Sequence, residues 1–268
     1  METKKIESID QLKELKALYM DQTTGPLDGM WLCGFVPTST HFGFYDDDKL
    51  VGFCCLNEEG YLLQFFLRTE YQAQSSEVFG ALLENNDSTV GQVKGAFVST
   101  AEPQFLSICL DSFSAFKVNA LMYRRDKSSY VASQAIELKL VEMEQLTETV
   151  RFVRTSVDLP EQWLTGYLTN LISRQELFGY WQDGRLLATG ESRGYDEYQL
   201  DYADLGVIVA ESERGKGLAT RVLKQLVAIT EAKDLTPICS TEKTNIGAQK
   251  AISRAGFFAA NRIIQFDI

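Results

Sequence analysis

Apolar residues recur every three to four positions in two segments of the second half of the chain. These segments, 143–156 and 161–173, are therefore predicted to be helices. One side of the second helix carries the apolar residues Trp163, Leu164, Tyr167, Leu168 and Leu171. A third helix is predicted after residue 217, with the buried stripe Leu218, Val222, Leu223, Leu226 and Val227.

Segments rich in β-branched and aromatic residues lie between these helices. They predict a hairpin and three further strands, at 177–193, 198–209, 236–241 and 257–268. Between the last two strands, Asn245 is a suitable N-cap for a helix through Ala248, Ala251 and Ile252, and Gly256 is a suitable stop. Alternating helices and strands predict a mixed α/β sandwich.

Three stretches of the first half reappear in order in the second half. The stretch from Gly43 matches that from Gly179 at an offset of 136, Leu67 matches Val209 at 142, and Ser99 matches Ser240 at 141. Three collinear matches favour a duplicated fold. We therefore predict one domain at 1–128 and a second at 136–268, joined by the polar linker "DKSSYVASQ".

Charge restricts the partners. The chain has 26 Lys and Arg against 37 Asp and Glu, which gives a net charge of -11. This charge is expected to repel nucleic acid and anionic membranes and to attract a small cation such as an amine. The apolar runs are too short to span a membrane and the start is polar, so we expect a cytoplasmic protein.

The cysteine and histidine residues do not indicate a catalytic or metal-binding site. The five cysteines, Cys33, Cys54, Cys55, Cys109 and Cys239, show no CxxC spacing and are expected to be core residues. The single histidine, His41, is expected to be structural. No metal site is predicted.

The stretch "VIVAESERGKGLATRVLKQL" passes from a strand through a glycine turn directly into a helix. Such a turn converges backbone N–H groups on one point at the positive end of the helix dipole, which suits a phosphate. Gly215 and Gly217 allow close approach, and Ala219 keeps the first helical turn slim.

These residues resemble a known family. Arg214 to Ala219 fit the pattern Q/R-x-x-G-x-G/A, and Asn245, Ala248, Arg254, Gly256 and Phe257 look like the N-x-x-A…K/R-x-G-F segment, of the GNAT (Gcn5-related) N-acetyltransferases. The resemblance covers 136–268. It implies two tandem GNAT folds of the α/β, mixed-sheet class and acetyl-CoA as co-substrate.

The resemblance implies a set of cofactor-binding residues: Val207, Ile208, Val209, Arg214, Gly215, Lys216, Gly217, Leu218, Ala219, Thr220 and Asn245. The strand amides of Ile208 and Val209 would pair with the pantetheine arm, and one of them would polarise the thioester carbonyl. A carboxylate near the end of this strand would be the general base. Asp204 is the first choice, with Asp201 and Glu191 behind it.

One catalytic position departs from the family. Ile252 stands where the family often has a tyrosine that reprotonates the thiolate, and Ser253 is a weak substitute because it lies about 100° round the helix. Two functions therefore stay open. One is an N-acetyltransferase acting on the amine of a small molecule or protein, and the alternative is a catalytically silent acyl-CoA-binding module.

The first half resembles a degenerate copy. Gln72 to Glu77 occupy the register of the turn without its glycines, and a carboxylate there is expected to repel the cofactor. Gln104 replaces the asparagine of the second motif, and Ala115 and Phe116 replace its Gly-Phe pair. The oligomeric state is left open.

Overall fold

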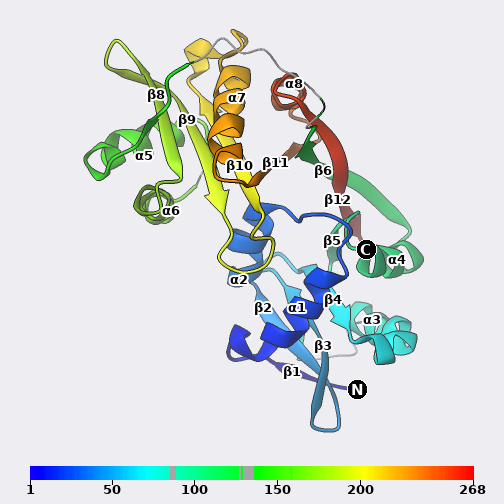
Figure 1. The fold of residues 1–268 in the computed structure, drawn as a ribbon. Helices are drawn as coiled ribbons and strands as arrows, with labels where there is room; N and C mark the ends of the chain where they lie inside the picture. Colours follow the sequence, from blue (N-terminus) through cyan, green and yellow to red (C-terminus); the bar gives the residue numbers. More distant parts are fainter. Residues whose placement is uncertain (85–88, 127, 129–135, 158) are drawn as a thin grey trace. The chain divides into compact units, whose positions relative to one another are not determined.

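A computed structural model describes residues 1–84, 89–126, 128, 136–157 and 159–268. Its contacts divide the chain into two compact units (Figure 1). Unit 1 consists of Met1–Leu121 together with Asn261–Ile268, and unit 2 consists of Met122–Ala260. Helices and strands alternate in both units, which confirms the mixed α/β class.

Unit 1 is built on a sheet in the order β1-β2-β3-β4-β5-β12-β6. Its strands are β1 (Glu2–Lys5), β2 (Thr40–Asp46), β3 (Lys49–Leu56), β4 (Tyr61–Leu67), β5 (Gly95–Ser99), the first part of β6 (Ala115–Arg125) and the end of β12 (Phe257–Asp267). Its helices are α1 (Lys13–Asp21), α2 (Val36–Thr38), α3 (Ser75–Leu83) and α4 (Pro103–Ser112). The predicted hairpin from Gly43 is confirmed as β2 and β3.

Two of the three apolar clusters described in unit 1 show how the helices cover this sheet. One joins α3 and α4 to the strands around Phe44, Phe65 and Phe266, all at most 5% exposed. The other joins α1 to Phe53 and Phe66 through Leu15. The helices therefore cover the two faces separately, with successive residues of β4, Phe65 and Phe66, pointing to opposite clusters.

The end of the chain belongs to unit 1. Strand β12 pairs antiparallel with β5 from Ile263 opposite Ser99 to Asp267 opposite Gly95. The predicted domains, 1–128 and 136–268, divide the chain at one point, whereas unit 2 interrupts unit 1 between Leu121 and Asn261. The domain bounds stay a prediction from sequence, and most of the predicted linker lies outside the described residues.

Unit 2 is built on a sheet in the order β7-β8-β9-β10-β11. Its strands are β7 (Lys139–Leu140), β8 (Leu177–Gln182), β9 (Arg185–Gly194), β10 (Tyr202–Val209) and β11 (Thr236–Glu242). Its helices are α5 (Leu146–Arg154), α6 (Glu161–Ser173), α7 (Leu218–Glu231) and α8 (Ile246–Arg254). The helices, hairpin and strands expected here are confirmed, including the buried stripe of α7.

The two faces of β9 meet different helices (Figure 1). A side chain at Gly190 would contact Leu226 and Val222 of α7, and Ser192 shares a 2.8 Å hydrogen bond with Thr230 of the same helix. The alternate residues face α6, since the Tyr167 hydroxyl donates to Glu191. Helix α7 therefore packs on one face of the sheet and α6 on the other.

Several residue predictions can be compared with the structure. Cys33 is exposed, so its assignment to the core is wrong, because it lies on a surface helical turn, whereas the other four cysteines are buried. His41 is buried and contacts Ser39 O and Lys16, as expected of a structural residue. In the parts of the chain that are described, no helix is long and apolar enough to cross a membrane.

Candidate functional site

The turn after β10 has the backbone of an anion site. Gly215 and Gly217 have φ values of +76° and +80°, in the left-handed region that favours glycine, and the space beside each Cα is open. Helix α7 begins immediately after Gly217, which has no side chain to cap it. The first backbone N–H groups of α7 therefore point outward at the positive end of the helix.

A cavity of about 820 Å³ opens at this turn. Strands β10 and β11 and helices α7 and α8 line it. All the predicted cofactor-binding residues except Lys216 lie in its wall: Val207, Ile208, Val209, Arg214, Gly215, Gly217, Leu218, Ala219, Thr220 and Asn245. Lys216 is exposed and pairs with Glu213 at 3.2 Å. The volume is within the range of about 300–1,000 Å³ typical of ligand sites.

Strands β10 and β11 stay paired over a short distance. Tyr202–Asp204 pair in parallel with Thr236–Ile238, but β10 continues to Val209. In the described pairing, the later residues of β10 face only β9. The strands therefore separate where the cavity begins, and backbone groups on one edge of β10 are available to a ligand.

Helix α8 closes another wall of the cavity. Asn245 caps it as predicted, its Oδ1 accepting from Ala248 N at 3.0 Å, and Gly256 follows it with φ of +87°. Lys250 and Arg254, one turn apart, also line the cavity. Neither cation was among the predicted cofactor-binding residues, although Arg254 belongs to the second motif and the spacing of the two on a predicted helix is a readable signal.

Ser156 is a further residue that sequence reasoning missed. It lies just after α5, lines the cavity and accepts a 3.0 Å hydrogen bond from Arg214 Nη2. No motif marks this serine, because its place depends on how α5 packs against the turn. The contact ties the turn to the connection between α5 and α6.

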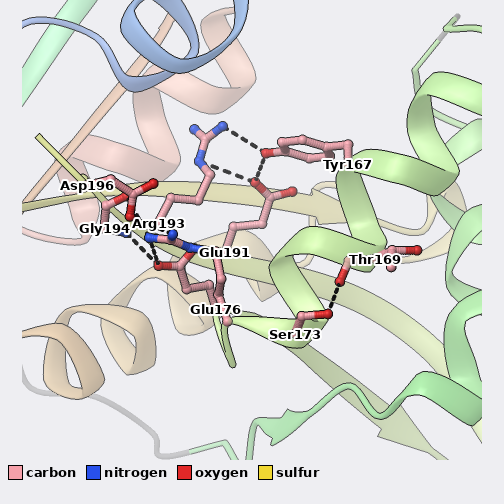
Figure 2. A network of polar contacts seen from close by, with 9 residues as sticks. Tyr167, Thr169, Ser173, Glu176, Glu191, Arg193, Gly194 and Asp196 are labelled. Atoms are coloured by element: carbon pink, nitrogen blue, oxygen red, sulfur yellow. Dashed lines mark hydrogen bonds and ion pairs between the residues drawn. The ribbon is translucent and has the colours of Figure 1, made fainter.

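The predicted base, Asp204, lies in a polar network on the face of β10 that meets α6. It is 3% exposed and accepts from Arg193, and it is not a lining residue of the cavity. Arg193 also donates to the Tyr167 hydroxyl at 2.8 Å, and Tyr167 donates to Glu191 Oε2 at 2.6 Å (Figure 2). Asp201, the other alternative, is exposed.

This network has a well-defined protonation pattern at Tyr167. Burial, followed by the neighbouring Glu191 carboxylate, raises the pKa of the Tyr167 hydroxyl above its usual value. The hydroxyl therefore stays neutral, with its proton directed to Glu191 and its lone pair facing Arg193.

A second network pins the start of β8 to the end of β9. Arg174 contacts both oxygens of Glu176 at 3.0 and 3.1 Å and Asp196 at 2.6 Å, and Gly194 N donates to Glu176 (Figure 2). The bidentate contact with Arg174 orients the Glu176 carboxylate. The hydrogen bond from Gly194 N to Glu176 then holds the end of β9, the strand that carries Glu191.

Ile252, at the position where the resemblance implies a tyrosine, is 4% exposed and lines the cavity. Among the described lining residues there is no tyrosine, and the hydroxyl groups there belong to Ser156, Thr220, Ser240 and Thr241. Ser253 is exposed and does not line the cavity. Cys239 is buried and lines it.

The matching place in unit 1 is filled. Phe65 of β4, Phe79 of α3 and Phe105 of α4 lie between the elements that correspond to β10, α7 and α8, with ring centroids 5.0 to 6.2 Å apart. A cavity of about 20 Å³ lies beside Phe65 and Phe105, but its lining comes from α1, the residues just after α1, β4 and the start of α4, and not from the turn or α3. None of the described residues from 69 to 77 has a positive φ.

The described residues contain no cluster of three or more His, Cys, Asp and Glu side chains that could hold a metal ion.

Both halves of the chain match models of one family. Residues 8–126 match an acetyltransferase (GNAT) domain, and residues 139–257 match the acetyltransferase (GNAT) family. A comparison with curated proteins returned no match.

Solved structures are similar over the whole chain. An acetyltransferase from the GNAT family from Colwellia psychrerythraea is 50% identical, with a TM-score of 0.97 and 100% of both chains covered. A tandem GNAT protein from the clavulanic acid biosynthesis pathway is 11% identical, with a TM-score of 0.65 and coverage of 98% of this chain and 97% of that one. The second likeness concerns the fold alone.

Proposed function

Because the chain belongs to the GNAT family of acetyltransferases, we propose that unit 2 transfers an acetyl group from acetyl-CoA to a primary amine of a small molecule or protein. The observation that carries this proposal is the 820 Å³ cavity that opens at the left-handed turn of Gly215 and Gly217. Bound acetyl-CoA supplies the acetyl thioester.

The residues of the cavity fit this co-substrate. Its phosphates suit the amides at the start of α7 together with the cations Arg214, Lys250 and Arg254. The pantetheine arm suits the free edge of β10, where Ile208 or Val209 supplies an amide that polarises the thioester carbonyl. The protein thus holds and orients the thioester, which contributes a large share of the rate through proximity.

Before it reacts, the acceptor is a cation, because a primary amine is protonated at neutral pH. A net charge of -11 attracts such a molecule electrostatically. Attack requires the neutral amine, so the acceptor must lose a proton at the site.

A second function rests on Ile252. If no group returns a proton to the leaving thiolate, unit 2 is a silent acyl-CoA-binding module. The apolar, buried side chain of Ile252 in the cavity wall favours this alternative.

One experiment separates the two functions. Acetyl-CoA is titrated calorimetrically into the full chain, and thiol release is then followed with butylamine, spermidine, tyramine and a lysine-containing peptide. Binding of one equivalent with amine-dependent thiol release supports the transferase. Binding without release from any amine supports the silent module, and no binding refutes both.

A further inference from the structure

The cavity and the polar network meet at one residue of β10. Gly206 lines the cavity, and it is the cross-strand partner of Glu191 on β9. A Cβ atom built on Gly206 would lie 3.1 Å from Glu191 Oε2 and 3.3 Å from its carboxyl carbon. The Glu191 carboxylate therefore lies directly against the backbone of β10 at the edge of the cavity, in space that a side chain at 206 would occupy.

Asp204 lies one step further back along the same face. Residues two apart on a strand share a face, so Asp204 and Gly206 both point toward α6. The Asp204 side chain is 4% exposed and forms an ion pair with Arg193, whereas the Glu191 side chain keeps 12% exposure. Neither carboxylate is a lining residue of the cavity, but the Glu191 carboxylate lies against the lining residue Gly206, whereas the Asp204 carboxylate is bonded to Arg193.

The charges of the network leave a place for a cation. In the contacts described for this network, two carboxylates, Glu191 and Asp204, face one guanidinium, Arg193, and the neutral hydroxyl of Tyr167. The distance between Arg193 Nε and Glu191 Oε2 is 3.6 Å, longer than a close charged hydrogen bond. A carboxylate oxygen can accept from more than one donor, so Glu191 can receive an ammonium while it keeps the bond from Tyr167.

We propose that Glu191 receives the acceptor ammonium at Gly206 and takes its proton, and that Arg193 and Asp204 position Glu191. This inference rests on the proposed function. One N–H bond of the ammonium breaks, its electron pair stays on nitrogen, and the proton joins Glu191. The net reaction converts an ammonium and a thioester into an amide, a thiol and one proton, which leaves Glu191 for solvent.

Tyr167 carries a reporter of this site. Its ring stacks on Trp163 with centroids 5.1 Å apart and planes 13° apart, and its hydroxyl donates to Glu191. Trp163 is 41% exposed. A cation that binds at Glu191 and shifts the Tyr167 ring should therefore change the fluorescence of Trp163, and W163F gives the background of the other tryptophans.

The first test compares Glu191→Gln with Glu197→Gln, a matched change at an exposed residue between β9 and β10. With the panel amine that reacts fastest, E191Q should lose about 100-fold in kcat and E197Q should match the wild type. Hydroxylamine is uncharged at neutral pH, so its reaction should be spared within about threefold in E191Q. Calorimetric Kd for acetyl-CoA and thermal unfolding control for folding, and Glu191→Asp provides a second variant.

The second test uses the pH profile. The charged and titratable groups facing Glu191 are Tyr167 from α6, Arg193 from β9 and Asp204 from β10. In the wild type, the rate should rise with pH as one group of the enzyme loses its proton. The E191Q variant should lose this rising limb of the pH–rate profile. Asp204→Asn should keep the limb but shift it, with kcat lowered about tenfold. A limb that survives in E191Q and vanishes in D204N would overturn the proposal and make Asp204 the base.

A third readout does not need turnover. Butylamine is titrated into the acetyl-CoA-loaded chain while Trp163 fluorescence is recorded. A response in wild type and E197Q that is absent in E191Q supports amine binding at Glu191, even if no panel amine releases thiol and the transferase proposal fails. An equal response in E191Q, or none in wild type, overturns the proposal.

Discussion

Unit 1 and unit 2 run through the same order of strand, turn, helix, strand and helix, but among the described residues a large cavity opens at the turn of unit 2 and not at that of unit 1. The cavity at the turn of unit 2 has about 820 Å³, whereas in unit 1 the rings of Phe65, Phe79 and Phe105 pack between the corresponding strand and helices. The turn of unit 2 uses two left-handed glycines, and the turn of unit 1 uses none. In this fold, the side chains that occupy one space therefore decide whether a cavity forms there.

For excluding a ligand from unit 1, the phenylalanine side chains that fill the space matter as much as the absence of the glycine turn. The sequence predicted exclusion of the cofactor by the carboxylate of Glu77, but this residue is exposed at the start of α3. Three phenylalanine rings already occupy the space. Steric filling, and not charge alone, separates the two units.

The largest expected effect is on the stability of unit 1. Phe79→Ala removes a side chain that is 0% exposed, and it should lower the free energy of unfolding by about 3–5 kcal/mol. Equilibrium urea unfolding measures this loss. Phe116→Ala, at a residue that is 59% exposed, is the control and should change stability by less than about 0.5 kcal/mol. Binding of a second equivalent of acetyl-CoA by F79A would contradict the view that the absence of the glycine turn also prevents unit 1 from binding the cofactor.

The next effect is on binding in unit 2. Gly217→Glu places a side chain at φ of +80° and a carboxylate where phosphate is expected, so Kd for acetyl-CoA should rise about 100-fold. Gly184→Glu has a similar φ of +72° in the β8–β9 turn, outside the cavity, and should bind normally. Calorimetry compares the two, and equal weakening would assign the effect to strain.

The third effect depends on pH. Burial raises the pKa of Glu102 in unit 1 from 4.5 to about 8, partly offset by the hydrogen bond from Ser99 N. The folded state thus holds the proton more tightly, and this stabilisation is present below about pH 4.5 and is lost as pH rises through about 8. Stability should fall by at most about 1.4 kcal/mol per pH unit in this window.

Glu102→Gln tests this dependence by urea unfolding at several pH values. The variant should remove most of the slope and be the more stable protein at alkaline pH. The corresponding residue of unit 2, Lys243, is exposed, so Lys243→Gln is a control that should leave the slope unchanged. An unchanged slope in E102Q would refute the assignment.

The smallest effect concerns a helix cap. Asn245→Ala removes the acceptor of Ala248 N and should cost about 1 kcal/mol in the stability of α8. The equivalent Gln104 of unit 1 accepts from the Gln72 side chain at the surface, so Gln104→Ala should stay within about 0.5 kcal/mol. Hydrogen exchange across α8 and α4 checks both, and equal protection losses would break the comparison.

Local pattern was enough to predict much of the fold and the residues that line the cavity at the turn. Helical periodicity identified the stripe of α7, and residue type identified the cap at Asn245 and the turn at Gly217, because each depends on neighbours in sequence. The pairing of Asp204 with Arg193 could not be read in this way. It depends on the register of β9 against β10, which brings residues eleven apart together.

Long-range partners were equally hidden at the C-terminus. The segment 261–268 reads as a strand in any context, but its partner, β5, lies more than 150 residues earlier. Ser156 is a similar case, because a serine after a helix carries no mark of the arginine that it meets across the cavity wall.

The placement of β12 also sets an order in time. The chain is synthesised from its N-terminus, so all of unit 2 is made before the strand that pairs with β5 exists. Until then β5 has one unpaired edge, which is a template for wrong pairing. Although unit 1 begins the chain, its sheet is completed last, and premature termination near residue 260 would leave unit 1, not the more recently made unit 2, without its final strand.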